Sequence, residues 1–232
     1  MRKLLIVIAM LFGLIAQAEA LNSTAVITAD NHYGLFIGNA TGSNLQFIGR
    51  NEIGPYGSAP NGGSNWYFPE AFSFDARPGD YLYVVAWDDR QAASGSGHFL
   101  MASFTTPNGV VVTTKSDWVF KSTDAGFPGD YGPVPPTADL LAMINSGSWS
   151  DVQAEINQSY LLSRGNFDPQ TRQIWSDAIV GASTGYVLFR SDLVISDPLP
   201  FVVAEPDMLA IFGIGVLGCV AGCRRKKVVM LN

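Results

Sequence analysis

Cysteine is nearly absent from this chain of 232 residues, and its two cysteines, Cys219 and Cys223, both lie near the C-terminus. The residues before them therefore have no disulfide framework, no thiolate nucleophile and no cysteine-ligated metal site. Histidine is equally scarce, with only His32 and His98. The chain accordingly lacks the His-Glu-x-x-His zinc motif, and it also lacks the Gly-x-x-x-x-Gly-Lys-Ser/Thr phosphate loop. These absences argue against the common zinc hydrolases and P-loop enzymes.

Charged residues make up only 15% of the chain, and 20 acidic residues outnumber 14 basic ones, which leaves a net charge of −6. Six of the 14 basic residues lie in the first 20 residues or the last 32, against three of the 20 acidic residues, so the segment between the ends is more acidic than the whole chain. An acidic surface repels nucleic acid and anionic lipid. We therefore expect no nucleic-acid partner.

The N-terminus has the pattern of a secretory signal peptide. Two basic residues precede an apolar run from Leu4 to Ala16, and Ala18 and Ala20 supply the small residues that a signal peptidase requires. The sequence therefore predicts that signal peptidase removes residues 1–20 during export. The alternative is an uncleaved membrane helix, for which the apolar run is short.

The C-terminus combines three features within about thirty residues. An apolar run covers residues 208–223 and predicts a short transmembrane helix, a little shorter than the hydrocarbon core of a bilayer. A basic cluster follows it directly, as in a stop-transfer segment with its basic end in the cytoplasm. The cluster consists of Arg224, Arg225, Lys226 and Lys227. Outside the predicted membrane span lies the motif Ala204, Glu205 and Pro206.

This three-part arrangement resembles the PEP-CTERM sorting signal of Gram-negative bacteria that make exopolysaccharide. In that family a Pro-Glu-Pro motif, a short membrane span and an Arg-rich tail are handed to an exosortase; here Ala204 stands at the first proline position. The resemblance implies that residues 201–232 are a sorting signal, that an exosortase-like membrane protease is a partner, and that the inner membrane holds the protein only transiently. The alternative is a permanent single-pass anchor.

Residues 21–200 have the composition of one exported β-rich domain with a substantial core. Short apolar runs alternate with Gly, Asn and Pro turn residues. Strands are expected at Thr24–Thr28, Tyr33–Ile37, Leu45–Ile48, Ala71–Phe74, Tyr81–Ala86, His98–Phe104, Val110–Thr113 and Tyr186–Ile195. Helices are expected at Thr137–Asn145 and Asp151–Leu162. Many short strands with few helices predict a mainly β fold, a β-sandwich or jelly roll.

Several of these segments also resemble galactose-binding-like jelly rolls. Val26–Asn39 is similar to a characteristic hairpin, Phe72–Ala86 to the next strand pair, and Gly97–Ser103 to the strand after it. Ile174–Ala178 and Tyr186–Arg190 are similar to a segment that precedes the hairpin in many relatives and follows it here. The resemblance implies that fold, with a permuted order or a closing strand. It implies no activity, because such folds host unrelated functions.

Aromatic and polar residues near two expected loops form a candidate glycan-binding site. Aromatic faces stack on sugar rings, and carboxylate and imidazole groups form hydrogen bonds with sugar hydroxyls. The candidate residues are Trp66, Tyr67, Trp87, Asp88, Asp89 and His98. The alternative for Trp66 and Trp87 is a core position, because large aromatic side chains are usually mostly buried. The other tryptophans, Trp118, Trp149 and Trp175, are assigned to packing.

Carboxylates supply the remaining candidate chemistry. Calcium ligands are offered by Asp30, Asp75, Asp80, Asp88 and Asp89, but their spacing matches no calcium loop. We therefore expect solvated turn carboxylates, no metal and no cofactor. Adjacent strand residues such as Asp88 and Asp89 point to opposite faces, whereas a glycosidase pair faces one cavity. More distant carboxylates, such as Glu70 and Asp75, keep a glycan hydrolase open as the less favoured alternative.

The sequence thus predicts an exported, non-catalytic protein of the cell surface or extracellular matrix, sorted by an exosortase-like system and associated with extracellular polysaccharide. The alternative is a permanently membrane-anchored structural or protein-binding surface protein.

Overall fold

The computed structural model describes residues 21–30, 32–51, 68–87, 98–122, 133–157, 159–176 and 185–196. All of them belong to a unit that ends at Asp197. The predicted signal peptide, sorting motif, membrane helix and basic tail lie outside the described residues. Within the described ranges, no helix is long and apolar enough to cross a membrane.

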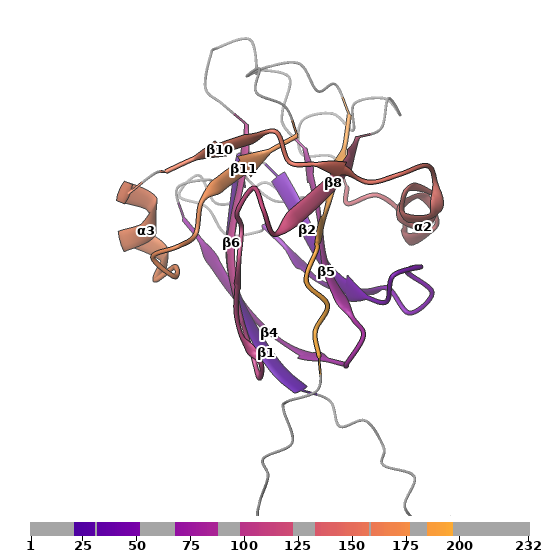
Figure 1. The fold of residues 1–232 in the computed structure, drawn as a ribbon, viewed down its shortest axis with the longest axis horizontal. Helices are drawn as coiled ribbons and strands as arrows, with labels where there is room; N and C mark the ends of the chain where they lie inside the picture. The colour runs from indigo at the N-terminus through magenta and orange to yellow at the C-terminus, as the bar shows by residue number, and fades with distance from the viewer. Residues whose placement is uncertain are drawn as a thin grey trace, which may run out of the picture. The chain divides into compact units, whose positions relative to one another are not determined.

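Two antiparallel sheets pack face to face as a β-sandwich (Figure 1). The first sheet contains, in spatial order, β10 (Ala154–Ile156), β11 (Gln173–Trp175), β6 (Phe99–Thr106), β1 (Leu21–Asp30) and β4 (Glu70–Ala76), with β7 (Gly109–Val112) paired to β6. The second sheet contains β3 (Gln46–Arg50), β2 (His32–Gly38), β5 (Tyr81–Trp87), β12 (Val187–Ser191), β8 (Trp118–Ser122) and β9 (Ser150–Asp151). The predicted mainly β sandwich is confirmed.

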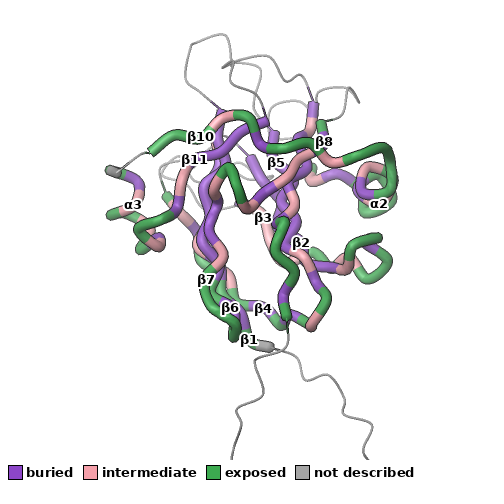
Figure 2. The backbone as a smooth tube through the Cα atoms, viewed as in Figure 1, coloured by how far each residue is buried: buried purple, intermediate pink, exposed green. Residues whose placement is uncertain are grey.

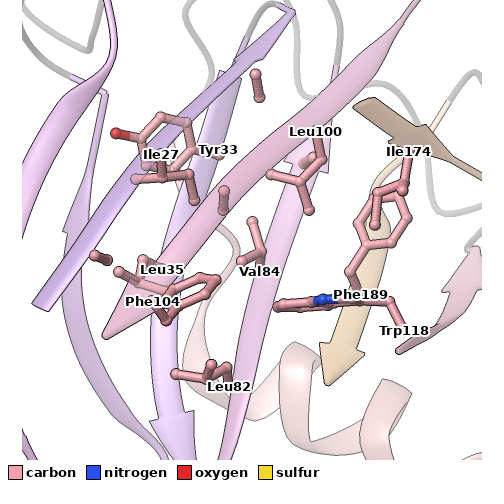
Figure 3. Close-up of a cluster of buried hydrophobic side chains, with 14 of the residues drawn as sticks. Ile27, Tyr33, Leu35, Leu82, Val84, Leu100, Phe104, Trp118, Ile174 and Phe189 are labelled. Carbon is pink, nitrogen blue, oxygen red and sulfur yellow. The ribbon is translucent and has the colours of Figure 1, made fainter. Parts of the chain in front are cut away.

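The core lies between the sheets and follows from the two-residue period of a strand. On β5, Leu82 and Val84 point into the sandwich, where they meet residues of the other sheet such as Leu100 and Phe104 of β6 (Figure 3). The intervening residues of β5 point outward, yet they are also buried. Because β5 is buried on both faces, its sequence is a continuous apolar run and does not alternate between apolar and polar residues.

One helix covers the outer face of each sheet (Figure 1). Helix α2 (Thr137–Asn145) buries Leu140 and Ile144 against outward-facing residues of the second sheet, among them Tyr83. Helix α3 (Ser159–Gly165) buries Leu161 against Phe99 and Met101 of the first sheet and Phe167. In Figure 2 the central strands are mostly buried, and the exposed residues are concentrated on the helices, the turns and the edge strands.

The helix predicted over residues 151–162 is wrong. The chain there forms β9, then β10, and becomes helical only at α3. Residues 154–156 pair with β11 across the sheet, with Ala154 opposite Trp175 and Ile156 opposite Gln173. Pairing with a strand that follows much later in the chain overrides local helix propensity here.

The two ends of the described unit meet at one end of the sandwich, called here the lower end as in Figure 1. The first residue of β1, Leu21, pairs with Ala76 at the end of β4. The turn that follows contains Gly79, whose φ of +90° suits glycine. The Gly79 N–H donates to the Ile195 carbonyl (2.7 Å), and the Ile195 N–H donates to the Asp80 carbonyl (2.8 Å). Both termini of the folded unit are therefore tied to the same turn.

Candidate functional site

The opposite, upper end of the sandwich carries the predicted site residues that the structure describes. There β5 ends at Trp87, β2 begins at His32, and His98 directly precedes β6. Trp87 and His32 are partners in the register of β5 and β2. The other four predicted glycan-binding residues lie outside the described residues; they are Trp66, Tyr67, Asp88 and Asp89.

Trp87 is fully buried, at 0% exposure. Its ring stacks on His32 (centroids 5.4 Å apart, planes at 22°) and meets Tyr186 edge-on at 5.3 Å. The Arg50 guanidinium lies 5.7 Å from the ring centroid, within cation–π range. Every face of the indole is thus in contact with protein, which is the core position named as the alternative for this residue.

His98 is also buried, at 7% exposure, and stacks on Trp175 with ring centroids 5.4 Å apart and planes at 29°. Trp175 in turn contacts Phe189 of the opposite sheet at 5.6 Å. The imidazole therefore closes the upper end of the core through an aromatic stack. The role of His98 in binding stays a prediction, whereas the packing role assigned to Trp175 agrees with its burial.

Glu70, one of the two distant carboxylates considered for hydrolysis, is engaged in the fold. It is buried and accepts a hydrogen bond from the Tyr33 hydroxyl, and the Tyr33 N–H donates to the Asn51 side-chain oxygen at 3.1 Å. Asp75, the other candidate, lies five residues further along the same strand and is exposed. Residues an odd number apart on a regular strand point to opposite faces, so this pair does not face one cavity.

The aspartates considered for calcium include one that the structure uses in a turn. Asp80 is 5% exposed, and its carboxylate accepts the Arg77 N–H at 2.9 Å and the Asn44 side-chain N–H at 3.1 Å. Such a carboxylate stabilises the turn through local hydrogen bonds. In the part of the chain that the structure describes, no cluster of three or more His, Cys, Asp or Glu side chains is arranged to hold a metal.

Lys121 forms a polar centre on the outer face of the second sheet. Its ammonium donates to the carbonyls of Met143 (3.0 Å) and Ile144 (2.8 Å) at the end of α2, and to those of Ser146 and Gly147. Unpaired carbonyls at a helix C-terminus attract a cation. Burial, and secondarily the charge of Arg190, lowers the pKa of Lys121.

Three cation–π contacts link this centre to Arg190 and two aromatic rings. The Lys121 ammonium lies 4.6 Å from the Trp149 ring centroid, and the Arg190 guanidinium lies 4.4 Å from the same ring and 4.8 Å from that of Tyr81. Lys121 and Arg190 thus share Trp149 between them. This arrangement agrees with a packing role for Trp149, and the Lys121 ammonium holds the end of α2 and the segment after it on the sheet.

The ionisation of Tyr83 at alkaline pH provides a test of its burial. Its hydroxyl donates to the Asn39 carbonyl at 2.8 Å, and burial raises the pKa of Tyr83 to about 12. The unfolded side chain ionises near pH 10, so the folded state keeps its full stability below pH 10 and loses it as pH rises toward 12. We expect the wild type to lose about 2 kcal/mol more than Tyr83→Phe over this range, measured by urea unfolding at pH 9 and pH 11.5. Equal losses in the two proteins would contradict the assignment.

A surface groove of about 400 Å³ lies on another side of the sandwich, between β3 and β4. These are the edge strands of the two sheets. The groove is lined by Gln46, Phe47, Ile48, Ser73, Phe74, Asp75 and Arg77. Apart from Asp75, sequence reasoning named none of these residues as functional. The sequence feature that could have indicated this groove was an aromatic residue in a short strand that follows a polar turn.

Sequence reasoning also passed over one match to the Gly-x-Ser-x-Gly pattern, at Gly181–Gly185. The serine, Ser183, lies outside the described residues. A nucleophile elbow requires a helix directly after the serine, because the strand-to-helix turn exposes the hydroxyl. Here Gly185 leads into strand β12 instead. The pattern therefore lacks its structural context, and no nucleophile is assigned to it.

Comparison with known proteins finds no matching family model, no similar curated protein and no similar solved structure. The class of the protein therefore rests on its own fold, a two-sheet antiparallel β-sandwich.

Proposed function

We propose that this protein is an exported, non-catalytic component of the cell surface or extracellular matrix. In this proposal it is held briefly in the inner membrane, processed by an exosortase-like protease and then associated with extracellular polysaccharide. The observation that carries the proposal is the position of the folded unit between the two delivery signals. Leu21, the residue directly after the predicted signal-peptide cleavage site at Ala20, already pairs with Ala76 of β4 in the sandwich.

The other boundary supports the same arrangement. The last described residues, up to Ser196, are tied to the lower end through the Ile195 backbone and through the Asn108 side chain, which donates to the Ser196 carbonyl. The predicted sorting motif begins only eight residues later, at Ala204. Cleavage near that motif would thus remove the tail and leave the hydrogen bonds of the sandwich intact. Leu21 and Ser196, the two ends of the described unit, both lie at the lower end.

We further propose that the sandwich is a galactose-binding-like jelly roll. Support comes from the path of the chain, which changes sheet between β1 and β2, between β3 and β4, and at each step from β4 to β6. Repeated crossing between sheets is typical of jelly rolls and differs from a meander of hairpins within each sheet.

Mass spectrometry of the exported protein tests the sorting proposal. We expect a mature N-terminus at Leu21 and a C-terminus near Ala204, from full-length protein produced in its own host. A secreted form that still contains Arg224 would overturn processing. A form that stays in the membrane fraction with residues 208–232 intact would instead support the permanent anchor. The processed protein should also sediment with the host's purified exopolysaccharide, and failure to do so would remove the polysaccharide part of the proposal.

A further inference from the structure

Arg190 is a cation on the outer face of the second sheet that the fold does not neutralise. It lies opposite Tyr83 of β5 and Val119 of β8 in the register of the sheet, and it is partly buried. Among the described residues no carboxylate forms an ion pair with it, and its Nε is buried without a hydrogen-bond partner. Charged groups that are partly removed from water normally have a partner. Arg190 therefore has an unused capacity to bind an anion.

Two aromatic rings hold the Arg190 guanidinium in place. Its central carbon lies 4.4 Å from the Trp149 ring centroid and 4.8 Å from the Tyr81 ring centroid, and the group also donates to the Tyr83 hydroxyl. A guanidinium stacks on rings through its flat face, whereas its N–H groups lie in its plane. Stacking therefore restricts the side chain without using up its donors, so little conformational entropy remains to be lost when a ligand binds.

The two rings beside Arg190 also carry unused polar atoms. Trp149 and Tyr81 are partly exposed. Within the described ranges neither the Trp149 indole N–H nor the Tyr81 hydroxyl forms a hydrogen bond, and neither of these atoms is buried. Each of these groups, like the guanidinium, can donate a hydrogen bond. Several donors around a cation suit a ligand group that is negatively charged and only accepts hydrogen bonds, such as a carboxylate.

The local charge around Arg190 is favourable for an anion. The Lys121 ammonium lies on the same indole ring, close enough for the charge of Arg190 to act on it, and it adds positive charge although its donors are taken by carbonyls. The Asp80 carboxylate accepts hydrogen bonds from its own turn. Asp151 of β9 and Asp192 after β12 form no ion pair with either cation in the part of the chain that the structure describes. More distant acidic residues count little, because salt screens charges beyond about 8 Å at physiological ionic strength.

We propose that Arg190 binds the carboxylate of a uronate, an acidic sugar unit of an extracellular polysaccharide, with the Trp149 and Tyr81 rings bordering the contact. This inference rests on the proposed function and gives it a site. A carboxylate is planar and accepts two parallel hydrogen bonds from a guanidinium. A neutral sugar would instead need an open aromatic face for stacking, and at Trp149 the cations Lys121 and Arg190 already contact the ring.

The test titrates the exported protein, labelled with nitrogen-15 in its own host, with sodium glucuronate, glucose and sodium acetate. We expect glucuronate to shift the Trp149 indole N–H resonance saturably, because this ring contacts Arg190. Glucose should leave the resonance unshifted, and acetate should bind more weakly than glucuronate because it lacks the sugar hydroxyls. The Trp118 indole is an internal reference, since it is 1% exposed and donates to the Val112 carbonyl. Trp149→Phe assigns the resonance.

Two substitutions separate the charge of Arg190 from its shape. Arg190→Gln should weaken glucuronate binding about tenfold or more, since a hydrogen bond to a charged group is worth at least one such factor. Arg190→Lys keeps the charge but loses the paired donors, and should weaken binding by a smaller factor. Arg172→Gln is the matched control, because Arg172 precedes β11 of the first sheet and donates to the nearby Pro169 and Thr171 carbonyls. Circular dichroism shows whether each variant is folded, and if Arg190→Gln is not, Arg190→Lys and the wild-type titrations decide.

Each outcome decides the proposal. A saturable Trp149 shift that weakens in the Arg190 variants and persists in Arg172→Gln supports the site. No such shift in the folded wild type, an equal response to glucose, or equal affinity for acetate overturns it, and so does an equal loss in Arg172→Gln, which indicates general charge attraction.

Sedimentation with the host's purified exopolysaccharide tests the proposed function separately. Binding of the polymer without a glucuronate response at Trp149 overturns the site and leaves the proposed function standing. A glucuronate response without binding of the polymer overturns the polysaccharide function alone.

Discussion

Replacing Trp87 with alanine should destabilise the protein by about 3–5 kcal/mol, the usual range for truncating a fully buried tryptophan. The indole is 0% exposed and contacts His32, Tyr186 and Arg50. These neighbours belong to three different strands or strand ends, so they cannot all move in to fill the cavity. Urea unfolding followed by far-ultraviolet circular dichroism measures the change, because it does not depend on tryptophan fluorescence.

Two further variants make the Trp87 prediction specific. Phe47→Ala removes another aromatic ring, but one that is 49% exposed, and should cost about 1 kcal/mol or less. Trp87→Phe keeps part of the ring volume and should lie between the two. If Trp87→Ala costs no more than Phe47→Ala, the indole is not a core residue, and its predicted role as a sugar-stacking surface gains support.

The expected loss also affects how binding experiments are designed. A variant that unfolds loses its ligand for a trivial reason, so Trp87→Ala by itself does not test a binding role. Phe47→Ala serves as the stability control for Trp87, because its half-exposed side chain contributes little to the core.

Lys121→Met should produce the second large effect, a loss of about 2–4 kcal/mol in the free energy of unfolding. The substitution keeps the length of the side chain but leaves the carbonyls of Met143, Ile144, Ser146 and Gly147 without their shared donor. Of these residues Ile144 is buried, whereas the Met143 carbonyl keeps the Ser146 N–H as a donor and Ser146 and Gly147 are exposed. The main cost is therefore the desolvation penalty of the Ile144 carbonyl. Loss of the cation–π contact with Trp149 adds to it. Denaturant unfolding measures the total.

Hydrogen exchange shows which part of the structure loses stability in Lys121→Met. Amide protection should fall most in α2, whose C-terminus the ammonium holds, and least in the central strands of the first sheet. Lys115→Met is the matched control, because Lys115 is exposed and its ammonium makes one long contact, 3.4 Å, to the Gln153 carbonyl. A similar small loss in both variants would show that the Lys121 ammonium does not hold the helix.

Local pattern predicted the main strands because their residues already match the environment that they occupy. The run Tyr81–Ala86 is apolar enough for burial on both faces, and β5 lies in the middle of its sheet with α2 outside it. Residues 151–162 differ. Their spacing of apolar residues also suits a helix, and only the presence of β11 beside them decides that residues 154–156 are a strand.

The candidate sites also differ in what local sequence predicted and what tertiary contacts decided. Trp87 and His98 were chosen because polar residues and expected loops lie near them in the sequence, but burial depends on partners far away in the chain. For Trp87 these are His32 and Tyr186, and for His98 the partner is Trp175. The groove was missed for the converse reason, since Phe47 and Asp75 become neighbours of one cavity only when two edge strands from different sheets lie side by side.

The sequence by itself determined the mainly β character of the protein, the positions of most strands and turns, and the prediction of export and sorting. These properties depend on composition and on the order of residues within short segments. The tertiary structure alone decided which aromatic rings are buried, which cation holds α2, and where a polar groove opens. Each of these depends on contacts between residues distant in the chain, and a local pattern carries no information about which distant segment will supply the other half of the contact.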